Sequence, residues 1–221
     1  MTPPDDRRHH VESLLARESL LDRAVERSTE TPVVRMLPDC HVIKIGGRSI
    51  MDGGRALVYP VVDALAKAMQ TKKLIIGTGG GVRTRHVFSI GIDLGLPTGA
   101  LAPLAQADAL GTAHMLGTLL APYGVVAPPP ESFASLLPLI IRVAPAVIFN
   151  GVPPYNLWEH PPGIGRIPPH RTDAGVFLLA ECFGASSVVL VKDVDGLHEA
   201  DPRQHPDAPL ISDITTSDLR A

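Results

Sequence analysis

Short apolar segments recur along the chain, and longer stretches with helical patterns separate them. The segments at 41–45, 73–77, 146–149 and 187–192 are apolar almost throughout. Such strands are typical of a parallel sheet that is buried on both faces, because the crossover connections place helices on each side of it. We therefore predict an α/β fold, a three-layer sandwich around a mostly parallel central sheet.

The stretches between these segments predict the helical layers. We expect helices that end near Met69 and Leu94 and others over 106–120, 132–137 and 173–185. Residues 1–38 carry apolar side chains at helical spacing before the first strand, so we expect an N-terminal arm, either a docking helix or a frayed terminus. The domain itself should then cover residues 39–221.

Length and composition favour one domain with an aliphatic core, since the 221 residues are 45% hydrophobic but only 4% aromatic. The net charge of -3 argues against nucleic acid as a partner. Cys40 and Cys182 belong to no paired motif, so neither a disulfide scaffold nor a zinc site is indicated. No apolar run reaches membrane-spanning length and no signal peptide is recognised, so we expect a soluble cytoplasmic protein without a membrane partner.

The segment CHVIKIGGRSIMD at 40–52 joins a predicted strand to a pair of glycines. Lys44 lies near the end of the strand, and Gly46 and Gly47 let the backbone turn tightly and approach a ligand closely. A lysine beside bare backbone amides suits a phosphate group. The alternative is an ordinary strand and glycine turn, with Lys44 reaching solvent.

A second glycine-rich turn follows the strand at 73–77 and contains Gly79, Gly80 and Gly81. It enters a predicted helix that carries Arg83, Arg85 and His86. Free amides and the positive end of the helix dipole suit an anion at such a turn. An ordinary strand-to-helix turn is the alternative, but the arginines that follow favour the anion site.

The connection at 150–171 is long for a compact domain and contains three Pro-Pro pairs. Connections of this length are generally functional or disordered, and aromatic residues with stiff prolines argue against disorder. His160 and His170 could bind a metal ion or an anion there. An ordered loop between subunits is an equally good interpretation.

Several of the polar residues follow predicted strands and are therefore expected to meet. In parallel sheets ligands bind at the carboxyl ends of the strands, where Lys44, the 78–81 turn, Asp173 and 192–195 should lie. Asp173 can either complement the dipole of its own helix or orient Lys44 or a bound cation. Neither glycine turn matches a Walker loop or the dinucleotide fingerprint. The sequence thus predicts a phosphate-handling site of another kind.

Four motifs in this order resemble the amino-acid kinase superfamily, which includes uridylate, acetylglutamate and aspartate kinases. They are KIGG at 44–47, the glycine-rich turn at 78–81, TDAG at 172–175 and KDVDGL…ADP ending at 202. The resemblance implies a fold of the carbamate and acetylglutamate kinase type, with ATP and Mg²⁺ as cofactors. Family members continue with a further helix and strands, so we expect a fold that is incomplete at the C-terminus.

Within the superfamily the chain is most similar to the molybdenum-storage branch. The similarity is carried by GVRTRHVFSIGIDLGLP at 81–97, VPPYNLWEHPP at 152–162 and RIPPHRTDAG at 166–175. It implies an ATP-binding subunit of a homo- or hetero-hexamer, which uses ATP hydrolysis to deposit molybdate or tungstate as oxoanion clusters.

The resemblance also implies roles for individual residues. Lys44 and Asp173 would be catalytic, Lys44 acting with Gly46 and Gly47 on the terminal phosphates while Asp173 organises the lysines. The acceptor phosphate or oxyanion would face Gly79, Gly80, Gly81 and Arg83. The nucleotide would be framed by Lys192, Asp193, Asp195, Gly196, Leu197, Asp201 and Pro202.

Departures from the family patterns keep other functions open. Where uridylate kinases usually show Asp-His-Met-Gly, this chain has Ala113-His114-Met115-Leu116, which weakens the kinase interpretation. Asn156-Leu157-Trp158 stands where one storage subunit type has a histidine run. The alternatives are a small-molecule kinase that converts ATP and UMP to ADP and UDP, and an inactive scaffold subunit.

Overall fold

The predicted strands pair in a four-stranded, fully parallel sheet. The computed structural model describes residues 35–152, 167–168 and 171–220. The strand order is β3-β2-β1-β4. The bounds are β1 Cys40–Ile45, β2 Lys73–Thr78, β3 Ala146–Phe149 and β4 Ser187–Val191.

Five helices are described around this sheet: α2 Arg55–Ala68, α3 Gly81–Asp93, α4 Thr98–Leu120, α5 Pro130–Val143 and α6 Thr172–Phe183. Short 3-10 helices lie at η2 Met51–Gly53, η3 Ala121–Tyr123 and η4 Asp218–Arg220. A small antiparallel pair, β5 Leu197–His198 and β6 Leu210–Ile211, follows the main sheet in the chain. Within the described ranges, no helix combines the length and apolar character needed to cross a bilayer.

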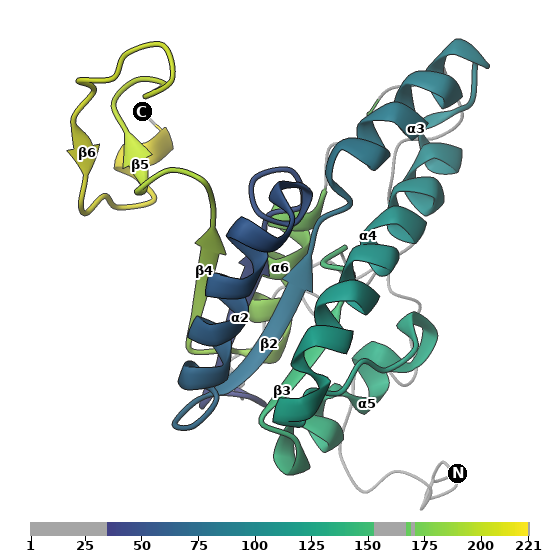
Figure 1. Ribbon diagram of the computed structural model, residues 1–221, viewed down its shortest axis with the longest axis vertical. Coiled ribbons are helices and arrows are strands. Elements are labelled where there is room, and N and C mark those ends of the chain that lie inside the picture. Colours follow the sequence, from purple (N-terminus) through teal and green to yellow (C-terminus); the bar gives the residue numbers. More distant parts are fainter. Residues whose placement is uncertain (1–34, 153–166, 169–170, 221) are drawn as a thin grey trace, which may run out of the picture. The chain divides into compact units, whose positions relative to one another are not determined.

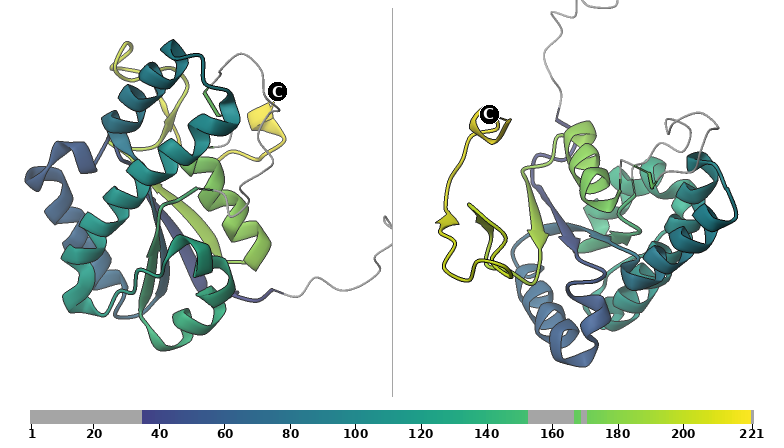
Figure 2. Two further views of the ribbon diagram at one scale, coloured as in Figure 1. Left: turned by 90° about the vertical axis from the view of Figure 1, so that its right-hand side faces the viewer. Right: turned by 90° about the horizontal axis from the view of Figure 1, so that it is seen from above.

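Helices cover both faces of the sheet, α2 and α4 on one face and α5 and α6 on the other (Figures 1 and 2). Adjacent residues of β2 show the alternation that produces these layers. Ile76 packs with Leu65 of α2 and Leu116 of α4, whereas Ile75 packs in the cluster that contains Leu179 of α6. The predicted three-layer sandwich with a parallel sheet is confirmed.

Two helices are longer than their patterns predicted. α4 begins at Thr98 rather than near Gln106, and α5 covers 130–143 rather than 132–137. Each contains an internal proline, which weakens a helical pattern because the ring removes a backbone donor. Tertiary packing compensates, since Leu101 of α4 and Ile141 of α5 are almost fully buried.

The fourth strand differs from the buried strand that its apolar sequence predicted. β4 pairs only with β1 among the described strands, so it forms an edge of the sheet. Val189 and Leu190 are 48% and 45% exposed. An apolar run alone therefore does not separate a central strand from an edge strand.

The residues just before β1 pack against the same body. Leu37 is fully buried, and the amides of Met36 and Leu37 both donate to the carbonyl oxygen of Phe183 at the end of α6. Residues 1–34 lie outside the described residues, so the predicted N-terminal arm over 1–38 stays a prediction.

Candidate functional site

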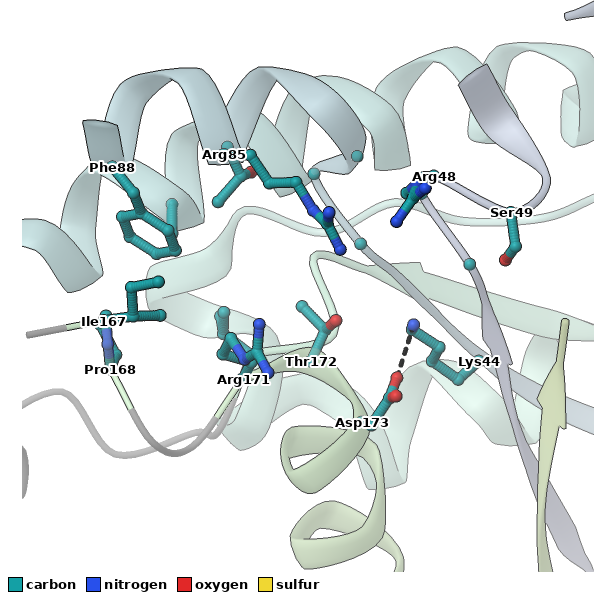
Figure 3. Close-up of a pocket in the computed structure, with 18 of the residues that line it drawn as sticks. Lys44, Arg48, Ser49, Arg85, Phe88, Ile167, Pro168, Arg171, Thr172 and Asp173 are labelled. Carbon is teal, nitrogen blue, oxygen red and sulfur yellow. Dashed lines mark ion pairs between the residues drawn. The ribbon is translucent and has the colours of Figure 1, made fainter. Parts of the chain in front are cut away.

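Two lysines share one carboxylate at the carboxyl rim of the sheet. Val42 of β1 belongs to the core cluster beneath α6, so Lys44, two residues later, points to the same face. Its Nζ lies 2.5 Å from Oδ1 of Asp173, in the first turn of α6 (Figure 3). Nζ of Lys192, which follows β4, lies 2.6 Å from the other oxygen, Oδ2. Of the two roles considered for Asp173, orientation of Lys44 therefore has direct geometric support.

The protonation of this cluster follows from burial and pairing. The Lys44 side chain is only 7% exposed, and this burial lowers the pKa of its ammonium although Asp173 partly opposes the shift. Burial acts to raise the pKa of the Asp173 carboxyl, but the hydrogen bonds and charges of Lys192 and Lys44 outweigh it. The Asp173 pKa therefore lies below its ordinary value, and the carboxylate is ionised at neutral pH.

The two glycine turns touch each other beside Lys44. A Cβ at Gly47 would lie 2.3 Å from the nitrogen of Gly81 and 2.4 Å from the carbonyl oxygen of Gly79. A Cβ at Gly79 would in turn lie 3.7 Å from Cε of Lys44. Only glycine allows this approach without moving backbone, which explains the residue types in both turns.

The start of α3 is not as free for a ligand as the sequence suggested. The amide of Val82, in the first turn, donates a 2.7 Å hydrogen bond to Oδ2 of Asp52, which belongs to η2. One of the free amides at this helix terminus is therefore already bonded within the chain and is not available to an anion. Other donors must supplement the glycine amides.

Arginines supply such donors in a pocket of about 930 Å³ that opens at this rim. Arg48 follows the first glycine turn, Arg85 extends from α3, and Arg171 is the N-cap residue of α6 (Figure 3). Across the described part of the chain, none of the three makes an ion pair. Unpaired guanidinium groups around a pocket are suited to bind an anion.

The pocket brings together most of the residues that the sequence singled out. Its lining contains Lys44, Gly46, Gly47, Gly79, Gly80, Gly81, Asp173, Lys192 and Asp193. The lining does not include Asp195, Gly196, Leu197, Asp201 or Pro202. His160 and His170 lie outside the described residues.

Arg83 is also absent from the pocket, because its Nη2 donates a 2.6 Å hydrogen bond to Oγ1 of Thr112 on α4. Arg85, two positions later, lines the pocket instead. The helical period could have identified it, since a residue four positions after Gly81 lies over the same face of the helix and a residue two positions after it does not.

Arg203 is a pocket residue that sequence reasoning missed. It lines the pocket and forms an ion pair with Asp193, while its amide donates to Oδ1 of Asp201. Asp201 therefore stabilises the turn that presents Arg203. No local pattern in the sequence signals this arrangement.

Apolar side chains of two helices also line the pocket. Phe88 and Ile92 of α3 and Ala102 and Ala105 of α4 line it. In the described ranges no group of three or more histidine, cysteine, aspartate or glutamate side chains is suited to a metal ion. A magnesium ion held mainly by nucleotide phosphates needs only one or two carboxylates, and Asp193 lines the pocket.

Comparison with known proteins gives a consistent picture. Residues 39–221 match the Amino acid kinase family. The chain is 47% identical over 214 residues to molybdenum storage protein subunit beta of Azotobacter vinelandii, covering 96% of this chain and 78% of the relative. It is 27% identical over 184 residues to a uridylate kinase of Metallosphaera sedula, covering 81% of this chain and 73% of that protein.

Solved structures agree on the fold. A uridylate kinase from Archaeoglobus fulgidus superposes with a TM-score of 0.62 at 20% identity, covering 81% of this chain and 75% of the other. An isopentenyl phosphate kinase complex gives a TM-score of 0.55 at 22% identity, covering 77% and 78%. The predicted similarity to the molybdenum-storage branch is confirmed by the 47% identity. On the family match and this identity together, the chain belongs to the amino acid kinase family.

Proposed function

We propose that the chain is an ATP-binding subunit that couples ATP hydrolysis to the deposition of molybdate or tungstate as oxoanion clusters. The observation that carries the proposal is the convergence of Lys44, Lys192 and three unpaired arginines on one pocket. The name and 47% identity of the storage-protein relative support the choice of cargo.

In this proposal the triphosphate tail lies against the first glycine turn. Gly46 and Gly47 allow close approach of the phosphates, and the ammonium groups of Lys44 and Lys192 neutralise charge that develops on the transferred group. Asp193 would hold a Mg²⁺ ion, which needs few protein ligands when nucleotide phosphates supply the others and would neutralise part of the phosphate charge. Phosphoryl transfer requires positioning and charge neutralisation more than covalent chemistry, so these groups suffice.

The oxyanion lies between the arginines in this proposal. Molybdate is an anion with several equivalent oxygens, and planar guanidinium groups bind such oxygens in pairs. Arg85 and Arg171 approach from α3 and from the start of α6, and Arg48 lines the same pocket just after the first glycine turn (Figure 3). The amides of the 79–81 turn add donors on the same side.

We further propose that the subunit assembles into a hexamer, either with copies of itself or with a related subunit. The relative is named as a subunit, which supports an assembly. Leu139 and Val143 on α5 are 67% and 84% exposed, an apolar surface of the kind that subunit contacts cover. Light scattering of the purified chain should report a mass well above 23.5 kDa.

A small-molecule kinase is the second candidate, and the apolar side chains in the pocket lining favour it. Phe88 and Ile92 could pack against the organic part of a phosphorylated acceptor while Arg85 binds its phosphate. A stored oxyanion has no organic part and makes no use of this wall.

One experiment separates these functions. The protein is incubated with Mg²⁺, ATP and molybdate, desalted and analysed for molybdenum, while ADP release is followed in parallel with and without UMP. We expect molybdenum to be retained only when ATP is supplied. Absence of retained metal with UMP-dependent ADP release would favour the kinase, and absence of ATP binding would favour an inactive scaffold.

A further inference from the structure

Asp52 caps a helix that lies far from it in sequence. The N-cap position of α3 is Gly80, which has no side chain to accept from the amides of the first turn. Oδ2 of Asp52 accepts the Val82 amide at 2.7 Å instead, from 30 positions earlier in the chain. The helix that carries Arg85 is thus anchored to the segment that follows the first glycine turn.

The same residue is tied to the first glycine turn through its backbone. The amide of Asp52 donates to the carbonyl oxygen of Gly47 at 2.9 Å. Its carboxylate is packed so closely against Gly81 that an added Cβ there would lie 2.5 Å from Oδ2. Asp52 therefore contacts both turns that line the pocket although it does not itself line the pocket.

We propose that Asp52 is a positioning residue that fixes the start of α3 against the Gly46–Gly47 turn, and thereby sets the position of Arg85 relative to Lys44. The inference rests on the proposed function of the pocket. Its carboxylate binds a backbone amide and not a ligand, so its effect on binding is transmitted through α3. Without this bond the first turn of α3 loses its hydrogen bond to the segment that follows the first glycine turn, and Arg85 lies just beyond that turn.

Asp52→Ala removes the anchor, while Asp52→Asn keeps an oxygen that can accept from Val82. Asp63→Ala is the matched control, because Asp63 is an exposed acid on α2 with no contact to either turn. Each full-length variant is compared with the wild type in Mg²⁺ and ATP. The measured quantities are the molybdate concentration for half-maximal retention, kcat for ATP hydrolysis, Kd for ADP and the thermal midpoint.

We expect Asp52→Ala to raise the half-saturating molybdate concentration about tenfold, as displacement of a binding group on the order of 1 Å can. The Kd for ADP should change less than about twofold, because Lys192 and Asp193 do not depend on α3. Asp52→Asn should restore most of the molybdate response, and Asp63→Ala should match the wild type.

A purely structural cap would lower the thermal midpoint and the fraction of active protein but leave half-saturation unchanged. If Asp52→Ala hydrolyses ATP and retains molybdate with unchanged half-saturation, the positioning role of Asp52 is wrong, and the proposed function of the pocket still stands. A wild type that neither hydrolyses ATP nor retains molybdate overturns the proposed function, and the positioning role with it.

Discussion

Replacement of Lys44 by methionine should separate function from stability. Lys44 is nearly buried, and burial lowers the pKa of its ammonium, so its charged form is held at a cost to the folded state. Methionine retains an unbranched chain of similar length without this cost. Asp173 keeps Lys192 at 2.6 Å and is about half exposed, so its carboxylate is not left buried and unpaired. We therefore expect the free energy of unfolding to change by less than about 1.5 kcal/mol.

The loss of activity should be much larger. A unit charge about 4 Å from the transferred phosphate contributes about 4 kcal/mol at an effective dielectric constant of about 20. Because each 1.4 kcal/mol is about a factor of ten, kcat/KM for ATP should fall roughly a thousandfold. Steady-state release of ADP measures this ratio, and urea denaturation followed by circular dichroism measures stability.

Lys67→Met is the control, since Lys67 is an exposed lysine on α2 outside the pocket. It should leave both measurements at the wild-type value. If kcat/KM of Lys44→Met stays within tenfold of the wild type, the ammonium does not face the reacting phosphate. A stability loss of about 3 kcal/mol or more would instead show that Asp173 depends on Lys44, as in a broken buried pair.

Three further predictions follow from the site. Gly47→Ala should cost about 1–3 kcal/mol of stability in urea denaturation, because its Cβ would meet backbone atoms of Gly79 and Gly81, whereas Gly111→Ala in α4 meets nothing within 4 Å and should gain about 0.5–1 kcal/mol. Arg85→Ala should weaken molybdate retention at unchanged ADP affinity, while Arg83→Ala should leave retention intact; equal losses would contradict the assignment. The pKa of Asp173 is below its ordinary value of 3.8, so the unfolded state binds more protons between these two values. The stability advantage of the wild type over Asp173→Asn should therefore be constant at neutral pH and decline below about pH 4; a pH-independent difference in acid denaturation would argue against the ionised pair.

The meeting of Lys44 and Asp173, 129 positions apart in the chain, could be expected from the sequence. The two-residue period of β1 gives the face of Lys44, and the parallel arrangement brings every strand end to one rim. The two-residue period and the common rim are properties of the backbone of any parallel sheet, and short apolar strands indicate such a sheet clearly. For the same reason the layers of the sandwich agreed with the patterns.

Three features of the structure could not be predicted from the sequence, because they depend on which face a helix turns to the pocket or on contacts between distant parts of the chain. The helical period separates Arg85 from Arg83 only once the face of α3 that Gly81 presents to the pocket is known, and the structure supplies that face. The bond from Val82 to Asp52 has no local signal, because donor and acceptor belong to different elements. The exposure of Val189 depends on whether another strand follows β4 in the sheet, which its own composition does not encode.

The carboxylate of Asp173 has one more consequence for the resting protein. Two ammonium groups brought to one place repel each other, and a pocket built on them would spread apart before any nucleotide arrived. With one oxygen on each lysine, Asp173 cancels half of their combined charge and holds each ammonium group at hydrogen-bonding distance from one of its two oxygens. The repulsion is thus overcome when the chain folds, and in the proposed function an incoming phosphate would meet cations already fixed in place with one net positive charge remaining to attract it.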